Sequence, residues 1–427
     1  MNKEDILRKH REYLYPCVAT YYQEPLVIAR GKGQLIYDID GREYLDFFGG
    51  IVTISAGHCN GEITEKIDRQ THTLQHASTL FPTEALVAMA ERLAQITPGR
   101  LTKSFFTNSG TEADETAILS ARLYTGSQEV IALRHGYSGR SALAMSLTGQ
   151  ASWRLGATAI PGIKHALSPY CYRCPLGKSY PDCEVACAKD IEELIQTSTS
   201  GRIAAFLAEP IQGIGGFITP PKEYFKIAVD IIRKYGGLFI ADEVQTAWGR
   251  TGDTWFGIEH WEVVPDIITS AKGMANGVPV GMTVTTPEIA DAFKGLSIST
   301  FGGNPVSMVA AKATIDFIAE RNLLQNAKVV GDYFRARLDT LKDKHPLIGD
   351  VRGMGLMQAL ELVKDRNTKE PATAEMARMM EKTKARGLLI GKGGLRGNVI
   401  RMSPPLTISK ADVDQAITIL DQSFAEQ

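Results

Sequence analysis

Two short apolar runs within residues 236–273 each end at a charged residue. Residues 238–241 lead into Asp242, and residues 267–271 lead into Lys272. Short continuous apolar runs are typical of strands that are buried on both faces, as in a parallel sheet. In open α/β sheets, ligands bind at the edge formed by the carboxyl ends of the strands. We therefore expect Asp242 and Lys272 at that edge, where an acid and an amine suit a cofactor that is bound as a Schiff base and carries a pyridinium nitrogen. On these two residues alone, a structural ion pair or a solvated rim is the alternative.

Four motifs follow one another in the same stretch. They are Asp242-Glu243-Val244-Gln245, Gly249-Arg250-Thr251-Gly252, Pro265-Asp266-Ile267 and Lys272-Gly273. In order and spacing they resemble the signature of the class III aminotransferases, which depend on pyridoxal 5'-phosphate. The resemblance implies an α/β protein of fold type I, a pyridoxal-phosphate-dependent transferase. Its large domain would have a mostly parallel sheet flanked by helices, and a smaller α+β domain would be built from both chain ends. Lys272 would hold the cofactor as a Schiff base, Asp242 would pair with the pyridine nitrogen, and Gln245 would hydrogen-bond the phenolic oxygen.

Two further motifs concern the phosphate and the ring of the cofactor. Residues 109–113 (SGTEA) follow an apolar run and open a helix, and the N–H groups at a helix start favour a phosphate. An ordinary capped helix explains the same residues, but the motif resembles the phosphate-binding turn of the family, which assigns Ser109, Gly110 and Thr111 to the phosphate. Residues 136–140 (GYSGR) resemble the block whose aromatic residue stacks on the cofactor ring, a role that falls to Tyr137. A core tyrosine at a strand end is the alternative.

Three more resemblances assign single residues. Glu209, in the motif EPIQG, would sit beside the cofactor. Thr300, in STFGGNP, resembles the threonine that reaches the phosphate bound by the neighbouring subunit, which implies a homodimer or a dimer of dimers with active sites at the subunit interface. Arg401, in IRMSPPL, resembles the arginine that binds the substrate carboxylate, which a planar guanidinium suits because it donates two parallel hydrogen bonds. Ile214 stands where some ω-amino-acid enzymes carry a glutamate that pairs with this arginine, which argues against an ornithine-like substrate.

The patterns along the chain predict two domains. Strand and helix patterns alternate from about residue 84 to residue 290, as expected of a largely parallel sheet. The pattern is then helical over 306–320 and 325–344, and short strands and helices follow to the end. Near the start, residues 31–51 predict a β-hairpin with a turn at Asp40-Gly41. We therefore predict a large cofactor-binding domain of residues 52–305 and a small domain of residues 1–51 and 306–427.

The charge balance excludes some classes of partner. The 427 residues carry 47 Lys+Arg and 48 Asp+Glu, so no basic excess points to nucleic acid or to an anionic membrane surface. No apolar run approaches the length that spans a bilayer. Residues 1–15 mix acids and bases without a continuous apolar segment, which argues against a secretory or transit signal. A cytoplasmic enzyme is expected.

Four of the six cysteines lie close together in the sequence, namely Cys171, Cys174, Cys183 and Cys187. Six cysteines in a chain of this size do not indicate a disulfide scaffold. The four could ligate a structural zinc ion, or they could remain reduced thiols in a packed loop. The zinc site is a hypothesis, and we assign no metal ligand.

The resemblance implies amino-group transfer by a ping-pong mechanism, with Lys272 as general base and acid. Residues 322–331 and 349–357 look most like segments of alanine–glyoxylate and β-aminoisobutyrate–pyruvate aminotransferases. We therefore expect a short donor such as alanine or β-alanine, and pyruvate or glyoxylate as the acceptor. The alternatives are an aminotransferase for 4-aminobutyrate, taurine or simple amines, and a phospho-lyase on the same scaffold. A cofactor-free binding protein would need a broken site, whereas Lys272, Asp242 and Gln245 are all present.

Overall fold

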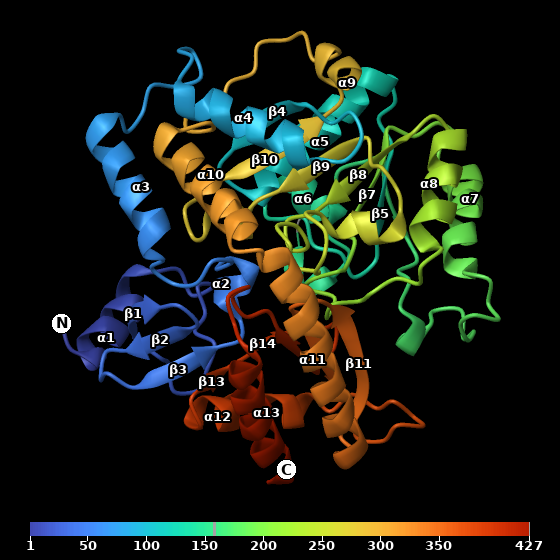
Figure 1. Ribbon diagram of the computed structural model, residues 1–427. Helices are drawn as coiled ribbons and strands as arrows, with labels where there is room; N and C mark the ends of the chain where they lie inside the picture. Colours follow the sequence, from blue (N-terminus) through green and yellow to red (C-terminus); the bar gives the residue numbers. More distant parts are fainter. Residues whose placement is uncertain (157–158, 427) are drawn as a thin grey trace.

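The computed structural model describes residues 1–156 and 159–426, and its largest element is a seven-stranded sheet (Figure 1). The strands lie in the order β4-β10-β9-β8-β7-β5-β6, and β10 is antiparallel to both of its neighbours. The other neighbouring pairs in this sheet are parallel, so the expected mostly parallel sheet is confirmed. The bounds are β4 Lys103–Thr107, β5 Val130–Leu133, β6 Ile163–Ala166, β7 Ala205–Ala208, β8 Leu238–Asp242, β9 Ile267–Ser270 and β10 Gly281–Thr285.

Helices cover both faces of this sheet because its central strands are buried on both sides. Successive side chains of a strand point to opposite faces. Leu207 and Ile240 belong to the apolar cluster under α5 and α6, whereas Phe206 and Phe239 pack on the other face with Phe225 of α8. The helices associated with this sheet are α3 Gly61–Thr73, α4 Glu84–Ile96, α5 Gly110–Thr125, α6 Ala142–Leu147, α7 Ala186–Ser198, α8 Tyr224–Lys234, α9 Pro287–Asp291 and α10 Pro305–Glu320.

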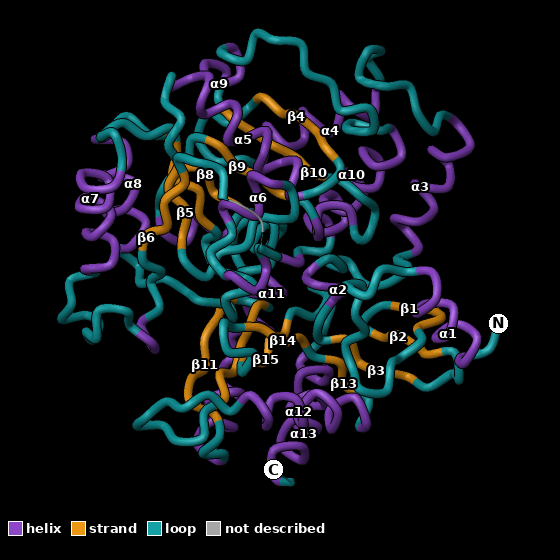
Figure 2. Tube along the Cα trace, turned by 180° about the vertical axis from the view of Figure 1, so that it is seen from behind, coloured by secondary structure: helices purple, strands orange, loops and turns teal. Residues whose placement is uncertain are grey.

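Two smaller four-stranded sheets lie below the large sheet in the view of Figure 1, and Figure 2 shows them from behind. One has the order β1-β2-β3-β13 and the other β11-β12-β15-β14. The strands are β1 Ile28–Lys32, β2 Leu35–Asp38, β3 Glu43–Asp46, β11 Ile348–Met354, β12 Met357–Leu362, β13 Leu388–Leu389, β14 Gly391–Gly393 and β15 Val399–Met402. The remaining helices are α1 Lys3–Tyr13, the short α2 Gly49–Val52, α11 Leu323–Lys344, α12 Thr373–Ala385 and α13 Lys410–Ala425.

The two chain ends meet through β13, which pairs with β3 in parallel. The predicted hairpin at Asp40-Gly41 is confirmed, since β2 and β3 pair across it and Gly41 has a φ of 85°. The sequence analysis missed β6 and β10, because lysine, histidine, glycine or threonine interrupt their apolar residues. The domain boundaries at residues 51/52 and 305/306 remain a prediction.

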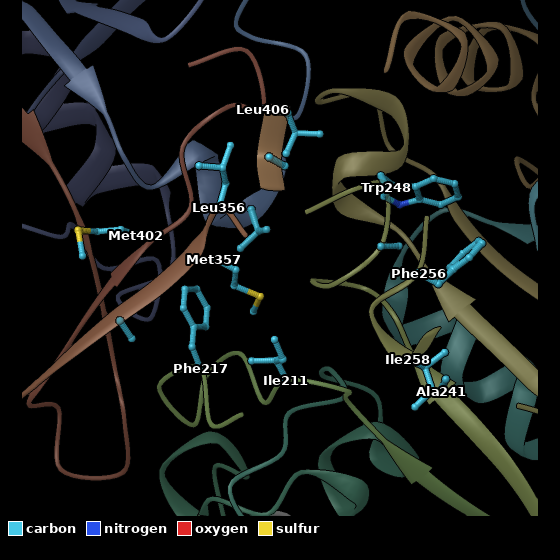
Figure 3. Packing of buried hydrophobic residues seen from close by; sticks show 14 of the residues in the cluster. Ile211, Phe217, Ala241, Trp248, Phe256, Ile258, Leu356, Met357, Met402 and Leu406 are labelled. Atoms are coloured by element: carbon cyan, nitrogen blue, oxygen red, sulfur yellow. The ribbon is translucent and has the colours of Figure 1, made fainter. Parts of the chain in front are cut away.

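The core is continuous from the large sheet into the C-terminal strands. Figure 3 shows Ile211 and Phe217, from the loops beyond β7, packed beside Met357 of β12, and all three are fully buried. Arg250 adds a polar link, because its guanidinium donates hydrogen bonds to the carbonyl oxygens of Leu356, at 3.1 Å, and Pro404. The Gly-Arg motif of the signature therefore joins the segment between β8 and β9 to the C-terminal part.

The four clustered cysteines line one surface pocket beside Tyr170 and Tyr180. Their thiols are free, as are Cys17 and Cys59. Within residues 1–156 and 159–426, no group of three or more histidine, cysteine, aspartate or glutamate side chains is arranged to hold a metal ion. The structure therefore gives the zinc hypothesis no support. Among the same residues, no helix has the length and apolar character needed to cross a membrane.

Candidate active site

A cavity opens at the carboxyl edge of the large sheet, as expected from the two apolar runs. It lies between the start of α5, the loop after β5 and the ends of β7, β8 and β9. Most of the residues assigned from the sequence line it, and they come from five separate segments. Its lining comprises Gly110, Thr111, Asp114, Tyr137, Ser138, Gly139, Glu209, Asp242, Val244, Gln245 and Lys272.

The start of α5 forms one wall of the cavity. Ser109 is the N-cap residue, and its Oγ accepts a hydrogen bond from the N–H of Glu112 at 3.3 Å. A side chain at Gly110 would meet Val244 at 3.0 Å, and one at Gly139 would overlap Thr111 Oγ1 at 2.0 Å. Glycine at these two positions therefore lets the helix start pack closely against its neighbours. The positive end of the helix dipole makes this wall suitable for a phosphate.

Asp242 and Lys272 face the cavity from the ends of β8 and β9. Asp242 is 2 % exposed, and its Oδ1 accepts a hydrogen bond from the N–H of Val244 at 3.1 Å. Burial raises the pKa of Asp242 to about 6, and nearby Lys272 opposes that shift. Burial also lowers the pKa of Lys272, which favours the neutral amine that a nucleophile or base requires. Lys272 has a φ of 41°, the left-handed region, and strained backbone of this kind clusters at functional sites.

Glu209 holds two loops of the cavity in place. Its Oε1 accepts from the N–H of Tyr137 at 3.0 Å, and its Oε2 accepts from the N–H of Gly213 at 2.7 Å. Burial, followed by the charge of Asp242, raises the pKa of Glu209 to about 8. The Tyr137 ring meets Trp153 edge-on, with 5.5 Å between ring centroids. This packing fixes the ring at the cavity wall.

Gln245 provides the clearest sign that the cavity is built for a polar ligand. Its Oε1 is buried and makes no hydrogen bond within the part of the chain that the structure describes. A buried amide oxygen without a partner is costly, so a bound group is expected to satisfy this side chain. Each part of pyridoxal phosphate has a suitable group around this cavity. The Gln245 amide suits the ring, the buried Asp242 suits the ring nitrogen, and the amine of Lys272 suits the aldehyde. The start of α5 suits the phosphate. The residues present therefore fit this cofactor.

Three assigned residues lie outside the cavity lining. Ser109 caps α5 behind Gly110, as described above. Arg401 of β15 is buried between the rings of Phe48 and Phe217, with its guanidinium carbon 5.6 Å from each ring centroid. It donates hydrogen bonds to the carbonyl oxygens of Lys392 at 3.1 Å and Gly213 at 3.2 Å. Thr300 is exposed, so the described chain does not bring it to its own cavity.

Sequence reasoning missed Asp114, a lining residue that is 1 % exposed. The sequence feature that could have identified it is its position on the face of α5 that also carries Ala117, Ile118 and Ala121, which are all fully buried. A carboxyl group on such a face needs a partner, and the sequence alone did not show which one.

Comparisons with known proteins agree with this geometry. The family model described as aminotransferase class-III matches residues 18–424. The chain is 46% identical to "alanine–glyoxylate aminotransferase 2 homolog 2, mitochondrial" of Arabidopsis thaliana, over 99% of this chain and 87% of that protein. It is 37% identical to a leucine/methionine racemase of Thermococcus litoralis, over 100% of this chain and 96% of the relative. A solved Bacillus anthracis aminotransferase superposes with a TM-score of 0.94 at 32% identity, and all of both chains is covered.

The chain therefore belongs to the class III aminotransferase family. It is a fold type I transaminase that uses pyridoxal phosphate and acts on an amino donor and a keto-acid acceptor.

Proposed function

We propose that this aminotransferase moves the amino group of a short amino acid, such as alanine or β-alanine, to pyruvate or glyoxylate. One observation carries the proposal: Arg401 is buried beside the cavity, and among residues 1–156 and 159–426 its hydrogen bonds go to carbonyl oxygens and it forms no salt bridge with a carboxylate. The residue after Gly213 is Ile214, so no acid at this position neutralises the guanidinium. The charge of Arg401 is therefore available to the carboxylate of a substrate, although the guanidinium also donates to two backbone carbonyl oxygens and lies near Tyr21. The Arabidopsis relative is named as an alanine–glyoxylate aminotransferase, which supports alanine as donor and glyoxylate as acceptor.

The residues of the cavity divide the chemical work. Bound pyridoxal phosphate would supply the electron sink that makes a proton on the carbon beside the amino group removable. Lys272 Nζ would bind the cofactor covalently and, once displaced by the donor amine, would carry that proton as base and then acid. Asp242 would hold a proton on the ring nitrogen by its negative charge. Glu209 and Gln245 would fix the ring, and the start of α5, with Ser109, Gly110 and Thr111, would bind the phosphate. Tyr137 would cover the ring.

The experiment that tests the function is titration of the purified protein with amino donors, followed by absorption. L-Alanine and β-alanine are expected to convert the cofactor band to that of the aminated cofactor, and pyruvate or glyoxylate should restore it. A stronger response to 4-aminobutyrate, taurine or simple amines would favour the first alternative. Phosphate release without a keto acid would identify a phospho-lyase. Inversion of an amino acid without amino exchange would identify a racemase like the Thermococcus relative.

Arg401→Gln is expected to raise KM for L-alanine by about 10- to 100-fold, because a charge-assisted hydrogen bond to a carboxylate contributes about 1.5–3 kcal/mol. KM for an amine without a carboxylate should change little. Steady-state kinetics with both donors measures this difference. Arg396→Gln, an exposed arginine on the connection between β14 and β15, is the matched control. An equal loss for both donors would refute a carboxylate-binding role.

We further propose a homodimer, or a dimer of such dimers, with active sites at the subunit interface. Leu80, Phe81 and Phe301 are 61–67% exposed. Their segments lie side by side, because the His76 and Phe301 rings are 5.3 Å apart and Asn304 Nδ2 donates to Gln75 O at 2.8 Å. Exposed apolar surface of this kind marks an interface, and a second copy of this chain is the occupant that the position of Thr300 requires.

Thr300→Ala is expected to weaken cofactor binding by roughly 10- to 100-fold, the effect of one lost hydrogen bond to a phosphate. Light scattering gives the oligomeric state, and titration of the apoprotein gives the affinity. Mixed dimers of Thr300→Ala and Lys272→Ala provide the decisive control. If Thr300 serves the partner, some sites in the mixture combine an intact Lys272 with an intact Thr300 and regain full affinity with activity. No recovery would place Thr300 in its own subunit's site or outside any site.

The cytoplasm is the compartment that we propose, and the free thiols of all six cysteines support a reducing environment. The name of the Arabidopsis relative places that protein in mitochondria. Fractionation of the source cells with an antibody to this chain distinguishes the two locations.

A further inference from the structure

Three carboxyl groups line the same cavity, and one amine faces them. Asp114, Glu209 and Asp242 are 1 %, 6 % and 2 % exposed, and Lys272 lies beside them. Arg401 also acts electrostatically on Glu209 and Lys272 from outside the lining. Buried like charges at short range cannot all be ionised unless enough opposite charge compensates them. At least one of the three acids is therefore expected to be neutral.

The hydrogen-bond partners distinguish the three acids. Glu209 accepts from two backbone N–H groups and Asp242 accepts from one, and donors of this kind oppose the rise in pKa that burial causes, although the pKa of Glu209 still reaches about 8. Asp114 accepts at Oδ1 from the hydroxyl of Thr269, at 2.7 Å, and has no backbone donor among the described residues. The adjacent Glu243 does not compete for the cavity, because the N–H groups of Gly257 and Ile258 and the hydroxyl of Thr246 bind its carboxylate.

Thr269 also fixes where Asp114 points. In the register of β8 and β9, Thr269 lies directly opposite Asp242. The hydroxyl that donates to Asp114 therefore projects from the residue beside Asp242, and both carboxyl groups line the same cavity. Two buried carboxyl groups placed in this way can share a hydrogen bond only if one of them supplies the proton.

We propose that Asp114 is a neutral carboxylic acid that donates a hydrogen bond to the Asp242 carboxylate, and so keeps Asp242 ionised and aimed into the cavity. Asp114 is a positioning residue that acts through Asp242, and the proposal rests on the proposed role of Asp242 at the cofactor nitrogen. Burial and the charge of Asp242 raise the pKa of Asp114 well above its usual range, and Asp114 offsets part of the rise that burial imposes on the pKa of Asp242. Both directions agree with a proton that stays on Asp114.

The neutrality of Asp114 is tested in the apoprotein with Asp114→Asn, which keeps the shape and a donor but has no proton to lose. An aspartate is ionised in the unfolded chain above about pH 4. Folding of the wild type must therefore return a proton to Asp114, and this becomes less favourable as the pH rises. Between pH 5 and pH 8, the urea concentration at the midpoint of unfolding should increase for Asp114→Asn relative to the wild type. Glu91→Gln, which neutralises an exposed acid on α4, should show no such gain. A difference that stays constant or shrinks would mean that Asp114 is ionised in the folded protein.

The positioning role is tested by titrating the apoproteins with pyridoxal phosphate and recording the pH dependence of the cofactor band. Asp114→Asn should bind within about threefold of the wild type and keep its pH profile. Asp114→Ala, which cannot donate to Asp242, should bind about tenfold or more weakly and shift the profile. Wild-type behaviour of Asp114→Ala would overturn the role, and an asparagine variant as weak as the alanine variant would show that a charge is needed.

Failure of the proposed function is distinguishable from failure of this inference. A wild type that binds no pyridoxal phosphate would refute the cofactor site and, with it, the positioning role. The stability measurement uses no cofactor and would still decide whether Asp114 is neutral.

Discussion

Lys272→Ala is expected to lose amino-group transfer by roughly 10⁴-fold or more, because the variant loses the covalent anchor and the proton carrier together. Burial lowers the pKa of Lys272, which favours the neutral amine that performs both steps. The variant should still bind pyridoxal phosphate, because the helix start and Asp242 remain. Single-turnover absorption with L-alanine measures the loss.

Two variants sharpen this prediction. Lys272→Arg keeps the positive charge but cannot form the Schiff base, so it should be nearly as inactive as the alanine variant. Lys294→Ala removes an exposed lysine and should behave like the wild type. Substantial turnover by Lys272→Ala would show that another group carries the proton, and the assignment of the site would be wrong.

Asp242→Asn is the second variant with a large expected effect. Asparagine keeps the size of the side chain but removes the negative charge that holds a proton on the ring nitrogen. Removing one partner of a buried charge pair costs about 3–5 kcal/mol, which corresponds to a loss of roughly 10²- to 10⁴-fold in rate. Measurement of kcat for L-alanine and of the cofactor band tests this.

The matched control is Asp253→Asn, an exposed aspartate between β8 and β9. Its φ of 58° is compatible with asparagine, so this variant should retain wild-type activity and stability. If Asp242→Asn retained most of the wild-type rate, protonation of the ring nitrogen would not limit the reaction.

The central part of the fold could be predicted because its signals are local. The apolar runs that end at Asp242 and Lys272 predicted two buried strands and a shared sheet edge, and β8, β9 and the cavity lie there. The antiparallel strand β10 was missed because glycine and threonine in residues 281–285 weaken its pattern, although its side chains are buried. The sequence also did not show that the short strands of the predicted small domain form two separate sheets. Strands as short as β13 and β14 contain too few residues for a clear periodic pattern.

The candidate site was less predictable where its residues act through tertiary contacts. Asp114 looks like an ordinary helix residue until Thr269 and Asp242 are placed beside it. Thr300 illustrates a different gap, because the group that it is proposed to bind would belong to another copy of the chain. Motifs report residues that repeat across a family, whereas an individual acid on a helix face is interpretable only after its neighbours are known.

Arg250 connects the two halves of the active site mechanically. It belongs to the segment that connects β8 to β9, and it donates hydrogen bonds to the carbonyl oxygens of Leu356 and Pro404, beside the strand that carries Arg401. We therefore expect the cofactor-binding sheet edge and the strand that carries Arg401 to unfold together rather than separately. Changes in substrate preference that loosen the C-terminal sheets would consequently reduce cofactor retention as well, even when no residue in contact with the cofactor has changed.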